Sequence, residues 1–306
     1  MVALVLLVAV SIQEFDVPTA DSRPHDPAAA PDGALWFTEQ KANKLGRLDP
    51  RTGRITEFSL PLRDSGPHGL AVDRDGNVWF TANYKGYVGK LDAKSGKVTP
   101  FQTGGDPHTP VIDANGVVWF TEQEADQVGR IDPKTGHVDL RRVPTRDAKP
   151  YGMVASPQGL IFCEFGSNKL ARIDPATLSI TEFPLPEGAR PRRLALAPDG
   201  TIYYSDFARG YLGHFDPRAG KFLGEWPSPG GPRSRPYGIA VTSDGAVWYS
   251  ESGVQPNTLV RFDPAAKSFS RTPIPSGGGV VRNMVATPQD ALYLACSGVN
   301  KVAIAR

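Results

Sequence analysis

One pattern repeats along the chain, and its period restricts the possible fold more than any other feature. Segments such as "PHDPAAAPDGALWFTE" and "PHTPVIDANGVVWFTE" begin with Pro-His, turn at Asp-Gly or Asn-Gly, and end in an aromatic pair and a carboxylate. A second piece of the kind "KLGRLDPRTGRITEF" follows nearly every copy. The aspartates of this second piece recur every 40 to 47 residues, at Asp49, Asp92, Asp132, Asp174, Asp216 and Asp263.

The two pieces together predict four short strands in every repeat. Asp-Gly and Asn-Gly are the preferred residues of two-residue hairpin turns, and Asp-Pro-x-Thr-Gly supplies a second tight turn. Apolar residues alternate with period two, and no helical period of 3.6 residues appears. Four strands in a period of this length are typical of a β-propeller blade. Seven copies therefore predict an all-β protein, a seven-bladed β-propeller with four antiparallel strands per blade.

The two ends of the chain complement each other. The seventh unit stops at "NKVAIAR", which supplies only its third strand, whereas "SIQEFDVP" at residues 11–18 resembles "RITEFSLP", the fourth strand of the first unit. We expect residues 11–18 to complete the last blade, which closes the ring and removes two open sheet edges. Residues 11–306 then form a single domain.

Composition and the N-terminus restrict the partners. A net charge of +2, with basic residues spread over the turns, argues against a nucleic-acid partner. The apolar segment 1–10 is too short to span a membrane and resembles a remnant of a signal peptide, although it lacks a basic start and an Ala-x-Ala site. We expect a secreted or periplasmic monomer, or a cytoplasmic one if this segment is no signal remnant. Cys163 and Cys296 fall in distant units, so both are expected to be free.

The repeat places the start of each first strand and the end of each second strand on one rim of the central channel. Two groups of residues share this rim. Blades one to three contribute the histidines His25, His68 and His108. Blades five to seven contribute the arginines and one tyrosine, namely Arg192, Arg235, Arg282 and Tyr237. The symmetry of the Asn-Gly turn puts His108 opposite Glu122. Such a pair either caps a hairpin or belongs to a site, and three histidines on adjacent blades leave the two interpretations equally weighted.

The repeated "PHG…DG.VWFTE…NKLGRLDP.TG.ITEF.LP" resembles the streptogramin B lyases, also called virginiamycin B lyases, over residues 11–306. The resemblance implies a seven-bladed propeller in which Mg²⁺ and a histidine base open the ester of a cyclic depsipeptide by elimination. The family's spacing is a histidine in one blade, then an acid, a second histidine and a glutamate in the next. This spacing is met once, by His68, Asp106, His108 and Glu122.

By this resemblance His108 is the general base, Asp106 and Glu122 bind Mg²⁺, and His68 orients the substrate. The order of the blades departs from the family, which places its site in the last two blades. The corresponding positions here are Tyr237, Val280, Arg282 and Cys296, and none of them can play the same part.

Three functions remain open from the sequence. The first is an Mg²⁺-dependent carbon–oxygen lyase that acts on an ester-linked cyclic peptide or a similar small molecule. The alternative is a non-catalytic secreted propeller whose arginines grip a small anionic or peptide ligand. A third is a lactonase-like metal hydrolase, for which the required central cage of Glu, Asn and Asp cannot be assembled.

Overall fold

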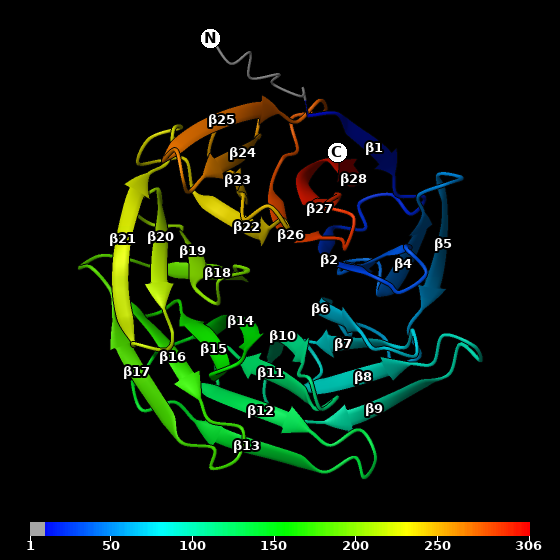
Figure 1. Cartoon of the computed structure of the whole chain (residues 1–306). Helices are drawn as coiled ribbons and strands as arrows, with labels where there is room; N and C mark the ends of the chain where they lie inside the picture. The colour runs from blue at the N-terminus through cyan, green and yellow to red at the C-terminus, as the bar shows by residue number, and fades with distance from the viewer. Residues whose placement is uncertain (1–9) are drawn as a thin grey trace.

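The computed structural model describes residues 10–306, so most of the apolar N-terminal segment lies outside the described residues. The described chain forms seven sheets of four antiparallel strands each, arranged as blades around a common centre (Figure 1). The first strands of all seven blades line a channel there. The prediction of an all-β, seven-bladed propeller is confirmed. Within residues 10–306 no helix is long and apolar enough to cross a bilayer, and the one helical element is the 3₁₀ turn η1 (Ser297–Val299).

The strands occupy the same place in every blade. The first strands, which line the channel, are β2 (Pro24–Ala29), β6 (Pro67–Val72), β10 (Pro107–Ile112), β14 (Pro150–Ser156), β18 (Pro191–Leu196), β22 (Pro236–Val241) and β26 (Val281–Ala286). The second strands are β3 (Leu35–Glu39), β7 (Val78–Ala82), β11 (Val118–Glu122), β15 (Gly159–Glu164), β19 (Ile202–Asp206), β23 (Val247–Glu251) and β27 (Leu292–Cys296).

The outer half of each blade is built in the same way. The third strands are β4 (Lys44–Asp49), β8 (Tyr87–Leu91), β12 (Gln127–Ile131), β16 (Lys169–Ile173), β20 (Tyr211–Asp216), β24 (Thr258–Asp263) and β28 (Lys301–Ala305). The fourth strands are β5 (Arg54–Ser59), β9 (Val98–Gln102), β13 (Val138–Arg142), β17 (Ile180–Pro184), β21 (Lys221–Pro227), β25 (Ser268–Pro273) and β1 (Ile12–Asp16).

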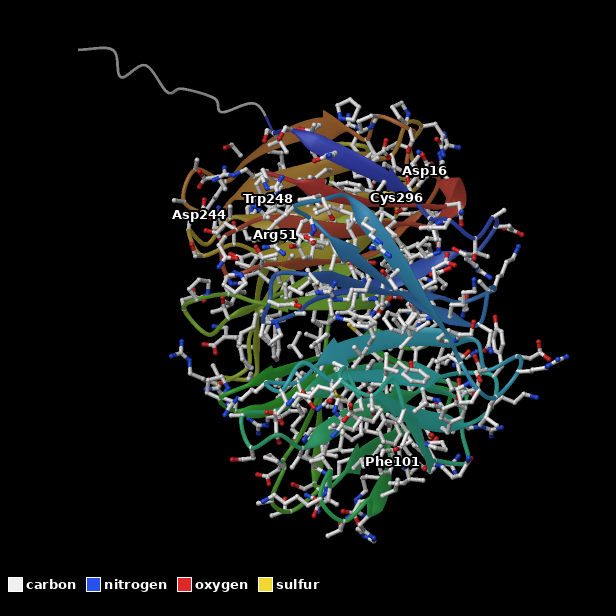
Figure 2. The ribbon with its side chains drawn as sticks, turned by 90° about the vertical axis from the view of Figure 1, so that its right-hand side faces the viewer. Asp16, Arg51, Phe101, Asp244, Trp248 and Cys296 are labelled. Atoms are coloured by element: carbon white, nitrogen blue, oxygen red, sulfur yellow. The ribbon has the colours of Figure 1, made fainter. Side chains whose placement is uncertain are left out.

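The ring closes where the two ends of the chain meet. Strand β1 pairs antiparallel with β28, with Ile12 opposite Ala305 and Asp16 opposite Lys301. The two strands are neighbours in both views, which differ by a 90° rotation (Figures 1 and 2). The prediction that the N-terminal strand completes the last blade is therefore confirmed, and each of the seven blades has its outer strand.

Each first strand carries a β-bulge close to its start. In blade three the pairing follows the symmetry of the turn at Pro110 and Phe120 and then shifts by one residue, so that Pro107 rather than His108 lies opposite Glu122. The prediction that His108 faces Glu122 across the hairpin is wrong for this reason. A bulge bends the strand and re-aims side chains, and here it frees the second and third residues of each first strand for the channel.

A hydroxyl near the end of the second strand joins the bulge to the next blade. Thr38 Oγ1 accepts a hydrogen bond from the backbone N–H of Asp26 at 3.1 Å and donates to the carbonyl of His68 in blade two at 2.7 Å. The same bridge recurs at Thr81, Thr121 and Ser205. The threonine of the repeated "WFTE" therefore positions residues of two neighbouring blades at once.

The aromatic pair of each second strand packs on opposite faces of its blade. In blade two Trp79 and Phe80 are both buried and belong to different apolar clusters. The tip of the Phe120 ring in blade three lies over Gly129, its partner on the third strand, and a Cβ built on Gly129 would come within 2.1 Å of that ring. Glycine is needed here because the ring occupies the space of a side chain.

Replacing Gly129 with alanine is expected to destabilise the protein by about 1–3 kcal/mol, since a methyl group forced into a packed core displaces its neighbours. Blade four carries Ala171 opposite Phe162, so a ring can shift far enough to keep the fold. The urea midpoint of unfolding measures the effect, and an unchanged midpoint would show that the contact is not tight.

Candidate functional site at the channel mouth

Seven side chains, one from the second residue of each bulged strand, surround the channel where the first strands begin. We call this set the mouth ring: His25, His68, His108, Tyr151, Arg192, Tyr237 and Arg282. It holds six of the seven side chains to which the sequence analysis assigned base or substrate-binding roles. Arg235 lies outside it, exposed, with its guanidinium 5.6 Å from the ring of Phe207.

The three histidines form a continuous row with one tyrosine. The ring centroids of His25 and His68 are 3.7 Å apart, as are those of His68 and His108, and Tyr151 follows at 3.9 Å from His108. All four side chains are buried, and His108 therefore does not lie on an exposed rim. Its Nδ1 contacts the hydroxyl of Thr109 at 3.0 Å, and its Nε2 has no protein partner among residues 10–306.

The opposite part of the mouth ring is organised by Arg192. Its guanidinium carbon lies 3.9 Å from the ring centroid of Tyr237 and 4.3 Å from that of Phe207. Its Nη2 donates to the hydroxyl of Tyr151 at 3.3 Å, and the hydroxyls of Tyr151 and Tyr237 are 2.6 Å apart. Arg282 is held separately, by a bond from Nε to Ser297 Oγ at 3.0 Å.

Below the mouth ring an ion pair crosses the channel. Arg193 of blade five donates from Nη2 to Asp26 of blade one at 2.7 Å and from Nη1 to Thr109 at 3.1 Å. The Asp26 carboxylate also contacts His25 Nδ1 at 2.9 Å and accepts from Asn283 at 3.2 Å. Asp26 and Arg193 are only 2% and 3% exposed. The pair is therefore the floor of the mouth ring.

The surroundings keep the three histidines neutral. Burial lowers the pKa of His25 well below its usual value of 6.5, and the charge of Arg282 lowers it further. Burial and the neighbouring His25 act in the same direction on the pKa of His68, and burial, His68 and Arg193 on that of His108. An unprotonated imidazole can accept a proton, so His108 is held in the form that a general base requires.

Asp106 and Glu122 do not join His108 in the channel. Both Asp106 oxygens accept from the backbone N–H of Glu124, at 2.9 and 3.0 Å. The Glu122 carboxylate is packed under Gly105, where a Cβ would meet it at 2.4 Å, and burial raises its pKa. Magnesium prefers several charged oxygens around one point, and among residues 10–306 no group of three ligand side chains within 4.8 Å of one another includes Asp106 or Glu122.

A different group of donors does converge at the mouth. Among residues 10–306, one set of three metal-binding side chains has its ligand atoms within 4.8 Å of one another, namely His25, Asp26 and His68. Two imidazoles and one carboxylate suit softer metals than magnesium, and Arg193 already neutralises this carboxylate. The set therefore does not fit a magnesium ion either.

Two other glutamates that end second strands, Glu251 and Glu39, are fully buried outside the mouth ring. Glu251 accepts from Ser228 Oγ, Thr258 Oγ1 and the backbone N–H of Gly230, so it holds the loop between two blades. Glu39 occupies the same place with neither oxygen bonded, and burial raises its pKa to about 8. Glu251 therefore holds a loop, whereas Glu39 makes no such bond.

Replacing Glu39 with glutamine is expected to stabilise the protein at pH 8 by about 1–3 kcal/mol and to change little at pH 4. The folded-state pKa lies above the unfolded value, so the unfolded chain loses this proton first and stability falls as the pH rises from about 4.5 to 8. Urea unfolding at both pH values measures the effect. Glu187→Gln, on an exposed residue, is the control, and an equal gain in both variants would contradict the assignment to burial.

Fold and site together define a class: a seven-bladed propeller with a polar, histidine-bearing channel mouth. The model of the virginiamycin B lyase family matches residues 5–222. Because this match covers more than half of the chain, the chain belongs to the virginiamycin B lyase family. The match ends before blades six and seven, which contain Tyr237, Val280, Arg282 and Cys296.

Individual relatives agree with this assignment. A virginiamycin B lyase from Streptomyces coelicolor is 48% identical over 46 residues, which is 15% of each chain. A streptogramin B lyase structure superimposes with a TM-score of 0.89 at 25% identity over 97% of both chains. A catalytically inactive virginiamycin B lyase from Staphylococcus aureus with quinupristin gives a TM-score of 0.87 at 23% identity, over 97% of this chain and 99% of that one. The last similarity shows the shared fold alone.

Proposed function

We propose that the protein is a carbon–oxygen lyase that opens an ester-linked cyclic peptide, or a similar small molecule, at the mouth ring. The observation that carries the proposal is the row of three buried histidines whose neighbouring ring centroids are 3.7 Å apart. Neutral imidazole is the most common general base in enzymes. Family membership supplies the reaction class, and the row supplies a base in blade three.

The proposed reaction needs a base and a stabiliser of negative charge. His108 Nε2 removes a proton from the carbon between a carbonyl and the carbon that bears the ester oxygen. The electrons of that C–H bond form a C=C bond, the adjacent C–O bond breaks, and the ester leaves as a carboxylate. The proton on His108 then passes to water.

Arg192 is suited to the charge that develops on the carbonyl oxygen. A fixed cation near that oxygen lowers the barrier because it requires no reorganisation during the reaction. The aromatic rings around its guanidinium and its bond to Tyr151 hold Arg192 in one position. His25, His68, Arg282 and Tyr237 would bind the rest of the substrate, and Arg235 its outer edge.

The test is ring opening of quinupristin, followed by chromatography, in Mg²⁺ and in EDTA. The proposal expects ring opening by the purified protein. If activity is lost in EDTA and recovered in Mg²⁺, this supports Asp106 and Glu122 as metal ligands in a rearranged site. If the rates in EDTA and Mg²⁺ are equal, Arg192 and not a metal ion stabilises the negative charge on the carbonyl oxygen. If quinupristin and related cyclic depsipeptides bind but stay intact, the lyase proposal fails and the ligand-binding alternative replaces it.

A further inference from the structure

The channel has a second compartment on the far side of the Asp26–Arg193 pair. It is a funnel of about 600 Å³ between the C-terminal halves of the seven first strands, and it opens toward their Asp-Gly turns. No residue of the mouth ring lines it, and its lining begins at the third residue of these strands, with Asp26, Thr109 and Arg193. We propose that this funnel binds a small neutral molecule with an amide group and an apolar tail.

The walls are suited to an apolar tail. They are formed by aliphatic side chains such as Leu70, Met153, Ile239 and Met284. Small-molecule sites are concave, enclose about 300–1,000 Å³ and combine apolar walls with a few convergent polar groups. The funnel has this volume and this composition.

The floor is polar but carries no net charge. Asp26 and Arg193 neutralise each other at 2.7 Å, and both side chains are buried. A charged ligand would lose its hydration without gaining a free counter-charge. The floor therefore selects a neutral head group.

Asn283 gives the floor its specificity. This half-buried residue lines the funnel and donates from Nδ2 to Asp26 at 3.2 Å. Its second amide hydrogen and its Oδ1 have no protein partner among residues 10–306, so it offers one donor and one acceptor side by side. An amide presents the complementary acceptor and donor, which a ketone, an ester or an ammonium group does not.

The test compares three probes with the same tail: hexanamide, hexanoate and hexylammonium. Two of the three methionines, Met153 and Met284, line the funnel, so isotope-labelled methionine methyl groups report occupancy by NMR. Hexanamide is expected to shift both signals with a Kd at least about 10-fold lower than either charged probe, as one hydrogen bond in a dry site predicts. Tighter binding of hexanoate, or no shift with hexanamide, would overturn the proposal.

Matched variants locate the binding. Ala155 is half-buried and lines the funnel, so Ala155→Trp should fill part of it and weaken hexanamide binding at least about 10-fold. Ala219→Trp, on an exposed outer turn, should leave the affinity unchanged. Equal affinity in both variants would place the probe elsewhere and refute the site. Because the Asp26–Arg193 pair separates the two compartments, the result does not depend on quinupristin turnover.

Discussion

Replacing His108 with alanine is expected to lower the turnover of quinupristin by about 10²–10⁴-fold, the usual loss when a general base is removed. No other imidazole can take its place without moving, because His68 is already packed between His25 and His108. The measurement is kcat under saturating substrate, with His137→Ala, a substitution of an exposed histidine, as the control.

His108 is buried, so its loss also leaves a cavity between His68 and Tyr151. The urea midpoint of the variant must therefore be measured beside its rate, and activity is compared at a temperature where both proteins are folded. His108→Gln keeps most of the volume and should be as inactive as the alanine variant. An active glutamine variant would show that His108 only fills space.

Breaking the ion pair across the channel is the second large expected effect. Arg193→Met should lower the free energy of unfolding by about 3–5 kcal/mol, because it leaves the Asp26 carboxylate buried without its cation. The double variant Asp26→Asn with Arg193→Met removes both charges and should recover most of this loss. Urea unfolding of the wild type, the two single variants and the double variant measures the coupling. A loss below about 1 kcal/mol for Arg193→Met would contradict a desolvated pair.

The repeat predicted the fold well because blade structure is local. Alternation, turn residues and a period of 40 to 47 residues fix four strands per unit, and the incomplete seventh unit shows which segment must close the ring. Each of these signals lies within one unit or at the chain ends. The blade count, the strand order and the pairing of β1 with β28 could therefore be inferred without coordinates.

The candidate site was predicted less completely because its geometry depends on neighbouring blades. Turn symmetry gives the correct pairing of Pro110 with Phe120, but the bulge then moves Glu122 opposite Pro107. The bulge is bridged by Thr121, which accepts from the backbone N–H of Thr109 and donates to a carbonyl of the next blade. Such a contact between blades has no signature in the spacing of one hairpin.

The floor of the mouth ring was missed for a related reason. Asp26 and Arg193 are 167 residues apart and meet only because the ring closes. A signal was present, since the third residue of the first strand is Gly in blades two, four and six but carries opposite charges in blades one and five. A charged side chain that faces the channel requires a partner of opposite charge, so the pairing of Asp26 with Arg193 across the ring could have been predicted.

The central claim is elimination at the mouth ring, and the nature of the product tests it most directly. The protein is incubated with quinupristin in water enriched in heavy oxygen, and the product is examined by mass spectrometry and NMR. The account predicts a linear product with the mass of the substrate, a new C=C bond and no oxygen from the solvent. A product that has gained one water and carries the heavy isotope would contradict it, because that outcome is hydrolysis.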